Sequence, residues 1–142
     1  MTKDMRLNNL IIAYLLVSPT LAFAQSSLSV NWDWKLSDKC SRTSPAITVA
    51  SIPEGTKMLR VKLVDHDMTS FDHGGGELAH SGGDTVTIPE GALKNYRGPC
   101  PPNFSSFGHD YEFSVRAFGE DNSTELAKGQ KTKTFSSSTV KN

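Results

Sequence analysis

Apolar and polar residues alternate along several short stretches of the chain. In the longest of these, over residues 28–36, polar positions separate the apolar Leu28, Val30, Trp32, Trp34 and Leu36. A period of two is typical of a strand with one buried face, because successive side chains of a strand point to opposite sides. We therefore predict a strand over residues 28–36.

Similar but shorter stretches follow, and clusters of Gly, Pro and Asn separate them. Strands are predicted over residues 47–49, 59–65, 85–88, 109–117 and 132–135. One helical turn is expected over residues 125–128, and the polar tail 136–142 is expected to fray. Repeated short strands separated by turns favour a mostly β protein with a β-sandwich. Its expected core includes Trp32, Trp34, Phe113 and Val115.

Residues 1–24 have the features of a signal peptide. Lys3 and Arg6 give it a positive start, and residues 10–17 form an apolar core. Ala22-Phe23-Ala24 then has the small-x-small pattern of a cleavage site before Gln25. The apolar run is shorter than the roughly 20 residues that a membrane span needs. We expect cleavage and a periplasmic or secreted protein, and an uncleaved anchor is the alternative.

Residues 25–142 are long enough for one domain. The whole chain has 15 basic and 15 acidic residues. Losing Lys3, Arg6 and Asp4 with the signal peptide leaves the two signs almost equal. A nearly neutral chain lacks the basic field that holds a phosphate backbone, so nucleic acid is not an expected partner. No later segment is predicted to span a membrane, and the oligomeric state is left open.

Cys40 and Cys100 are the only two cysteines of the chain. Disulfides form and persist in oxidising compartments, so we expect this pair to be bridged in an exported protein. The alternative is two buried free thiols. A metal or redox site would require more ligands or a closer spacing than this pair offers.

All four histidines lie between Asp65 and Tyr111, in a region rich in Asp, Gly and Pro. This region contains the blocks Asp65-His66-Asp67-Met68, Phe71-Asp72-His73, Gly98-Pro99-Cys100-Pro101-Pro102 and His109-Asp110-Tyr111. Such a composition is typical of loops, and loops on a rigid scaffold commonly form binding sites. The sequence therefore predicts a site built from these blocks.

The order of the blocks resembles that of the phosphatidylethanolamine-binding protein (PEBP) family. That family has an Asp-Pro-Asp-Ala-Pro segment, an aromatic-x-His block, a Gly-x-Gly-Pro-Pro loop and a His-x-Tyr pair in the same order. Upstream, Ser44-Pro45 and Pro53-Glu54-Gly55-Thr56-Lys57 resemble two further family elements. The resemblance covers residues 34–117 and implies a Greek-key β-sandwich with few short helices and a pocket at one edge.

By matching positions, the resemblance also implies the lining of that pocket and a phosphate-like or phosphoethanolamine ligand. The implied ligand-binding residues are Asp65, Asp67, Phe71, His73, Gly98, Pro101, Pro102, His109 and Tyr111. The chain departs from the family where His66 replaces a proline and Gly74-Gly75-Gly76 replaces an aromatic-rich stretch, so a wider and more flexible mouth is expected. His66 and His80 are expected at the surface.

The residue types of these blocks suit an anion or a zwitterion. Backbone N–H groups in turns bind anions, and glycines let a ligand approach them closely. Imidazoles donate hydrogen bonds to phosphate, and their protonation changes near neutral pH. Carboxylates orient a histidine or receive an amine.

Three hypotheses follow. The first is an exported, non-enzymatic binding protein for a small anionic or phosphorylated ligand, with His73 and His109 as donors. The second, implied by the resemblance, is an inhibitor or regulator of an exported protease or of another protein. The third is a metal-dependent hydrolase. The histidine spacing matches no closed zinc pattern and no serine lies in a nucleophile motif, so neither a metal nor a cofactor is expected.

Overall fold

The computed structural model describes residues 26–142, so the predicted signal peptide lies outside the described residues. The elements, in chain order, are β1 (Ser26–Ser27), β2 (Ser29–Asn31), the 3-10 helix η1 (Leu36–Asp38), β3 (Ile47–Ala50), β4 (Met58–Asp65), β5 (Gly75–Ala79), β6 (Thr85–Ile88), β7 (His109–Phe118) and β8 (Glu125–Phe135). The chain is therefore mostly β, as the alternating pattern predicted.

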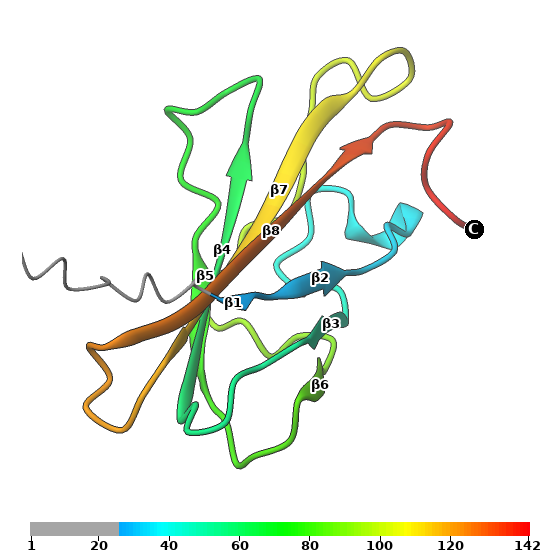
Figure 1. The fold of residues 1–142 in the computed structure, drawn as a ribbon. Coiled ribbons are helices and arrows are strands. Elements are labelled where there is room, and N and C mark those ends of the chain that lie inside the picture. Colours follow the sequence, from blue (N-terminus) through cyan, green and yellow to red (C-terminus); the bar gives the residue numbers. More distant parts are fainter. Residues whose placement is uncertain (1–25) are drawn as a thin grey trace, which may run out of the picture.

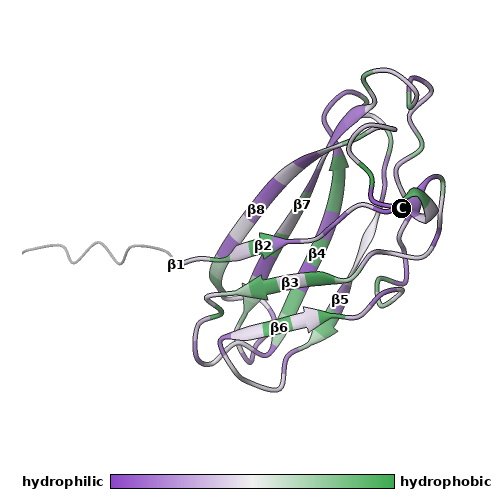
Figure 2. Cartoon of the chain, turned by 90° about the vertical axis from the view of Figure 1, so that its right-hand side faces the viewer, coloured by the Kyte–Doolittle hydropathy of each residue, from purple (hydrophilic) through white to green (hydrophobic). Residues whose placement is uncertain are grey.

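The strands form two sheets that face each other (Figure 1). The larger sheet has the order β1-β8-β7-β4-β5, and the smaller sheet has the order β2-β3-β6. The pairs are antiparallel except for β1, which runs parallel to β8. In Figure 2 the strands of the smaller sheet cross in front of those of the larger sheet. The prediction of a β-sandwich is confirmed.

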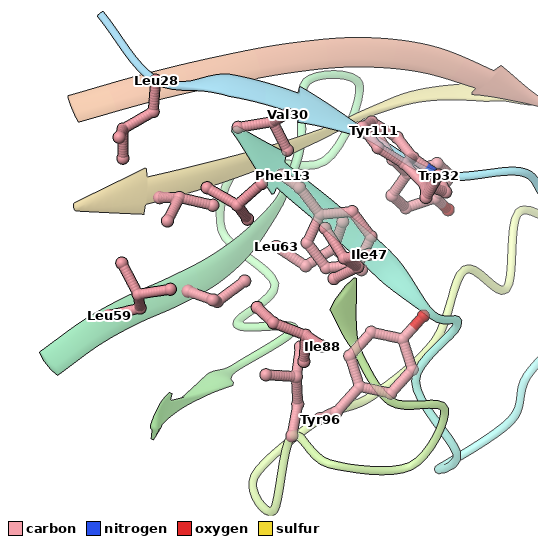
Figure 3. Close-up of a cluster of buried hydrophobic side chains, with 14 of the residues drawn as sticks. Leu28, Val30, Trp32, Ile47, Leu59, Leu63, Ile88, Tyr96, Tyr111 and Phe113 are labelled. Atoms are coloured by element: carbon pink, nitrogen blue, oxygen red, sulfur yellow. The ribbon is translucent and has the colours of Figure 1, made fainter. Parts of the chain in front are cut away.

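The core lies between the two sheets and consists of the apolar positions of the alternating strands (Figure 3). Leu59, Val61 and Leu63 of β4 point inward, while Arg60 and Lys62 between them are exposed. The same alternation in β7 buries its apolar residues against the smaller sheet. Because strand side chains have a period of two, one register places all of these residues on the inner face.

Aromatic rings fill the centre of this core. Phe113 is fully buried, and its ring centroid lies 4.9 Å from that of Trp32, with the rings edge to face. The Trp34 ring packs at 5.4 Å against that of Phe135, also edge to face. Such arrangements are favourable for aromatic pairs. The core positions predicted for both tryptophans are confirmed.

The strand predicted over residues 28–36 is shorter in the structure, where β2 covers only Ser29–Asn31. β2 ends at Asn31, and Trp32 and Trp34 are buried without belonging to a strand. The chain leaves the sheet here to contact the C-terminal tail: Lys141 N donates to Trp34 O at 2.9 Å. Alternation alone could not show this difference, because an irregular extended segment buries alternate side chains in the same way.

Two expectations for the C-terminal region were wrong, while the strand predicted over residues 132–135 is part of β8. Residues 125–128 form the start of β8 instead of a helical turn, because pairing with β7 buries Ala127 opposite Ala117. The tail 136–142 is also docked and not frayed: Leu36 N donates to Lys141 O at 3.2 Å. No helix within residues 26–142 is long and apolar enough to cross a membrane.

The glycine run 74–76 is an ordered part of the sheet, which the sequence did not predict. Gly75 and Gly76 begin β5, and Gly74 O accepts a hydrogen bond from Leu63 N at 3.0 Å. Gly74 has a φ of +67°, and a Cβ there would lie 1.8 Å from Asn95 O. A side chain is therefore excluded at this position, and the close approach explains the glycine.

Candidate functional site

The candidate site lies where β4 ends and β7 begins. These strands are neighbours, and Asp65 at the end of β4 is paired directly with Tyr111 of β7. The loop after β4 carries His73, and β7 starts at His109. The loop after β4 (green) and the loop before β7 (yellow) both lie at the upper end of the larger sheet in Figure 1. Adjacent strands thus bring together blocks that are distant in the sequence.

Asp65 is the hub of this site. Its Oδ2 accepts a hydrogen bond from His109 Nδ1 at 2.8 Å and lies 3.7 Å from His73 Nε2. Its Oδ1 accepts from the backbone amides of Asp67 and Met68, at 2.9 Å and 3.0 Å. The residue therefore both ends a strand and caps the following turn, as aspartates commonly do, while it also contacts two imidazoles.

These hydrogen bonds keep the Asp65 carboxylate ionised. Burial alone would raise its pKa, but the bonds from His109 and from the Asp67 and Met68 amides hold the pKa of Asp65 below its ordinary value. The side chain is only 4% exposed.

His73 is fixed from several sides. Its Nδ1 lies 2.7 Å from Arg97 O, and because a carbonyl can only accept, this nitrogen carries a proton and donates. Its ring packs edge to face on Tyr111 at 5.3 Å and on Phe71 at 4.6 Å. The Nε2 atom therefore faces Asp65 in a defined orientation.

Tyr111 packs against both histidines, with ring centroids 5.3 Å from His73 and 6.2 Å from His109. Burial, the Asp65 charge and a hydrogen bond with the Asp65 side chain raise the pKa of Tyr111, so its hydroxyl stays protonated. The backbone of Cys100 also bonds this hydroxyl. Through Tyr111 the 98–102 loop is thus connected to Asp65.

The 98–102 loop is held from its other side by the segment after η1. A disulfide joins Cys40 and Cys100, with the Cα atoms 4.5 Å apart, so the predicted pairing is confirmed. Two backbone hydrogen bonds of 2.7 Å run beside it, from Cys40 N to Pro99 O and from Gly98 N to Ser41 O. A Cβ at Gly98 would lie 2.7 Å from Ser41 O, which explains the glycine at the start of this loop.

The mouth of the site carries exposed groups of both charges. The Asp67 side chain is exposed, and its Oδ2 accepts from Asp110 N at 2.7 Å. Phe71 is 42% exposed, and the Arg97 guanidinium lies 5.9 Å from its ring centroid. Sequence reasoning missed Arg97. Its position directly before the Gly98-Pro99 block was the available signal.

The remaining predicted residues lie as follows. Pro101 is buried and Pro102 is exposed in the same loop. His66 is exposed, as predicted, and its Nε2 lies 3.1 Å from Glu112 Oε2. The surface position predicted for His80 is wrong. His80 is 7% exposed, because its ring hydrogen-bonds Gly83 O at 2.9 Å in a separate turn.

Access to the hub is narrow. The side chains of Asp65 and His73 are each 4% exposed, and that of His109 is 11% exposed. A ligand arriving from solvent therefore meets His109, Asp67 and Phe71 first. The wider mouth expected from the sequence is not what the described conformation presents.

A metal ion has three possible ligands here. Atoms of Asp65, Asp67 and His109 lie within 4.8 Å of one another. The same atoms take part in hydrogen bonds within the chain: His109 Nδ1 and two amides donate to Asp65, and Asp110 N donates to Asp67 Oδ2.

No protein-family model and no curated protein sequence matches the chain. Among solved structures, it is similar to the crystal structure of E. coli YbcL, described as a new member of the mammalian PEBP family. The TM-score is 0.55 at 19% sequence identity, and the match covers 80% of this chain and 99% of YbcL. This protein has a PEBP-like fold. The fold implied by the sequence blocks is confirmed, and the PEBP-like sandwich places those blocks at one end of its larger sheet.

Proposed function

We propose that this PEBP-like protein is an exported, non-enzymatic binding protein for a small anion or a phosphorylated head group. The observation that carries the proposal is the convergence of His73 and His109 on the Asp65 carboxylate, at 3.7 Å and 2.8 Å. Residues from two loops and two strands meet at this one place. The membership of YbcL in the PEBP family supports the same ligand class.

The hydrogen bonds of the site support an anion when the histidines are protonated. Both Nδ1 atoms are committed, to Arg97 O in His73 and to Asp65 in His109. Of the two Nε2 atoms, that of His109 is left to bind a ligand, while that of His73 faces the Asp65 carboxylate at 3.7 Å. Asp65 and Asp67 place two carboxylates beside these rings, and the Arg97 guanidinium adds a positive charge at the mouth.

The exposed Asp67 supports a zwitterionic head group. Its carboxylate lies within 4.8 Å of His109 but stays accessible to solvent. A phosphate on His109 would place an attached amine within reach of this carboxylate. Phosphoethanolamine carries both groups, so it should bind more tightly than inorganic phosphate.

Export is supported by the disulfide. Structural disulfides persist in oxidising compartments and are rare in the cytosol. N-terminal sequencing of the protein from the periplasm or the medium tests this part. A mature chain that starts at Gln25 is the expected result, and an intact N-terminus in the cytosolic fraction contradicts export.

Binding is tested by calorimetry with inorganic phosphate and phosphoethanolamine between pH 5 and pH 8. His73→Ala and His109→Ala should each weaken binding by about tenfold or more, since a charge-assisted hydrogen bond contributes about 1.5–3 kcal/mol. His109→Gln provides a second variant that is less disruptive to folding. His66→Ala is the matched control, because it removes an exposed imidazole outside the hub.

Two results would contradict the proposal. One is the absence of binding by the wild type at every pH. The other is binding that none of the His73 and His109 variants weakens beyond the His66 control. Stoichiometric metal in protein purified without chelators would instead revive the cluster of Asp65, Asp67 and His109 as a metal site.

A further inference from the structure

The outer face of the larger sheet carries a compact group of cations. Arg60 and Lys62 of β4, Arg116 of β7 and Lys128 of β8 are all exposed there, because the residues alternating with them fill the core. The register pairs Arg60 with Arg116, and Arg116 with Lys128. Three cations thus stand in one row across three strands.

Such a row has an energetic cost. Neighbouring strands are about 4.8 Å apart, so the row places three positive charges within about 10 Å. Like charges directly opposite each other destabilise a sheet. Carboxylates of the chain offset part of this repulsion, and a bound anion would offset the rest.

The two arginines of the row have carboxylate partners at its edges. Arg60 Nε lies 2.7 Å from Glu77 Oε1, and Arg116 Nε lies 3.3 Å from Glu125 Oε2. The lysines differ from them: within residues 26–142, neither Lys62 nor Lys128 is in an ion pair. Two ammonium groups therefore remain available to a ligand.

The cations surround a hollow of about 370 Å³, here called the outer-face hollow. It is lined by Arg60, Lys62, Glu112, Ser114, Val115, Arg116, Lys128, Gly129 and Gln130. Ser114 is a small residue among the long side chains of this lining. A volume of this size is within the range of small-molecule sites.

The other polar groups of the hollow are also suited to a ligand. Gln130 and Ser114 stand in the same cross-strand row as Lys62, and both can donate hydrogen bonds. Glu112 is the one carboxylate of the lining, and its Oε2 contacts His66 Nε2 at 3.1 Å and Thr132 Oγ1 at 3.4 Å. The Glu112 carboxylate is therefore partly engaged by His66 and Thr132, which lie outside the hollow.

We propose that the outer-face hollow binds a small ligand with at least two phosphate or sulfate groups. Lys62 of β4 and Lys128 of β8 lie on the two strands that flank β7, and each would bind one anionic group. Arg60 and Arg116 would donate further hydrogen bonds between them. Arg and Lys are the side chains that proteins use for such oxyanions. This site is separate from the histidine hub, whose residues do not line the hollow.

A long polyanion fits this surface less well than a small ligand. Glu77, Glu112 and Glu125 flank the cations, so the positive field is confined to the hollow. Binding a nucleic-acid backbone requires an extended basic surface, and the balanced charge of the chain does not provide one.

The test is an NMR titration of the protein with pyrophosphate, using inorganic phosphate as the probe with a single anionic group. Pyrophosphate should shift the amides of Ser114, Gly129 and Gln130, and its affinity should fall by about tenfold in the double variant Lys62→Gln/Lys128→Gln. Lys39→Gln/Lys57→Gln is the matched control, since it removes the same charge from exposed lysines outside the hollow.

Three outcomes would overturn the inference. The first is that pyrophosphate causes no shifts on the outer face. The second is an equal loss of affinity in both double variants, which indicates a general charge effect. The third is that the shifts cluster around His73 and His109, which assigns the anion to the hub. Persistence of the outer-face shifts in His109→Gln separates this site from the proposed head-group site.

Discussion

Cys40 and Cys100 are 60 residues apart in the sequence, and their disulfide brings the two Cα atoms to 4.5 Å. The bond fastens the 98–102 loop to the segment after η1. The same loop reaches the candidate site, because the Cys100 backbone bonds the Tyr111 hydroxyl. A single covalent link therefore acts on both the stability of the sandwich and the position of the site.

The first prediction is that the double variant Cys40→Ser/Cys100→Ser loses about 4 kcal/mol of unfolding free energy, the chain-entropy value for a closed loop of this length. Its binding of phosphoethanolamine should also weaken, since the 98–102 loop loses its anchor. Urea denaturation and calorimetry measure the two effects. Wild-type protein treated with reductant is the control, and unchanged stability in both samples would show that the bond is not formed in solution.

A second prediction concerns the glycine that follows His73. Gly74→Ala combines a φ of +67° with a Cβ only 1.8 Å from Asn95 O, so the backbone must move. We expect a loss of about 3 kcal/mol or more in unfolding free energy, together with weaker ligand binding as His73 is displaced. Urea denaturation followed by calorimetry would measure both losses.

Gly55→Ala is the matched control for Gly74→Ala. Its φ is +85°, but no atom lies within 4 Å of the added Cβ. Only the strain of the left-handed backbone remains, which costs about 1 kcal/mol. Equal losses in the two variants would mean that the Asn95 contact is not as close as the structure has it.

The sequence predicts those strands whose position depends on burying alternate apolar side chains, and it misses a strand that is positioned by backbone hydrogen bonds. β4 and β7 were predicted well, because Leu59, Val61 and Phe113 alternate with polar residues and the hydrophobic effect fixes their register. β5 was missed because Gly75 and Gly76 carry no pattern. Its place is determined by hydrogen bonds to β4 and to Asn95, which sequence alone does not show.

The site likewise contains residues that the sequence predicted and residues that it missed. The motif order brought Asp65, His73 and His109 into one predicted site, and the structure places their side chains in contact, although their binding role stays a prediction. Arg97 was missed although it directly precedes the Gly98-Pro99 block, and the burial of His80 was not predicted. The Arg97 carbonyl reaches His73 only through tertiary folding, whereas the Gly83 carbonyl reaches His80 within one local turn.

The third prediction concerns Asp121 in the turn between β7 and β8. The Thr124 hydroxyl, together with the Thr124 and Ser123 amides, holds the pKa of Asp121 well below its ordinary value. Thr124→Val removes the hydroxyl, so the pKa should rise toward the usual value of about 3.9. Carboxyl NMR titration measures both proteins. Identical titration curves would contradict the bonding of this turn.

The last prediction concerns the pH dependence that Asp65 gives to stability. Because its folded pKa is lowered, the ionised carboxylate stabilises the fold above the unfolded pKa of about 3.9, and this contribution is lost as the pH falls through the folded value. Asp65→Asn should therefore reduce the unfolding free energy at pH 7 by about 1–3 kcal/mol, since the hydrogen bonds from His109 and the two amides lose their charged acceptor. The difference from wild type should shrink below about pH 4.

Urea denaturation of both proteins between pH 7 and pH 3 measures this difference. Asp67→Asn is the control, because Asp67 is exposed and an exposed carboxylate contributes little to stability. A difference between wild type and Asp65→Asn that stays constant down to pH 3 would show that packing, and not the charge of Asp65, stabilises the hub. The histidines would then lack the counter-charge on which the proposed ligand site depends.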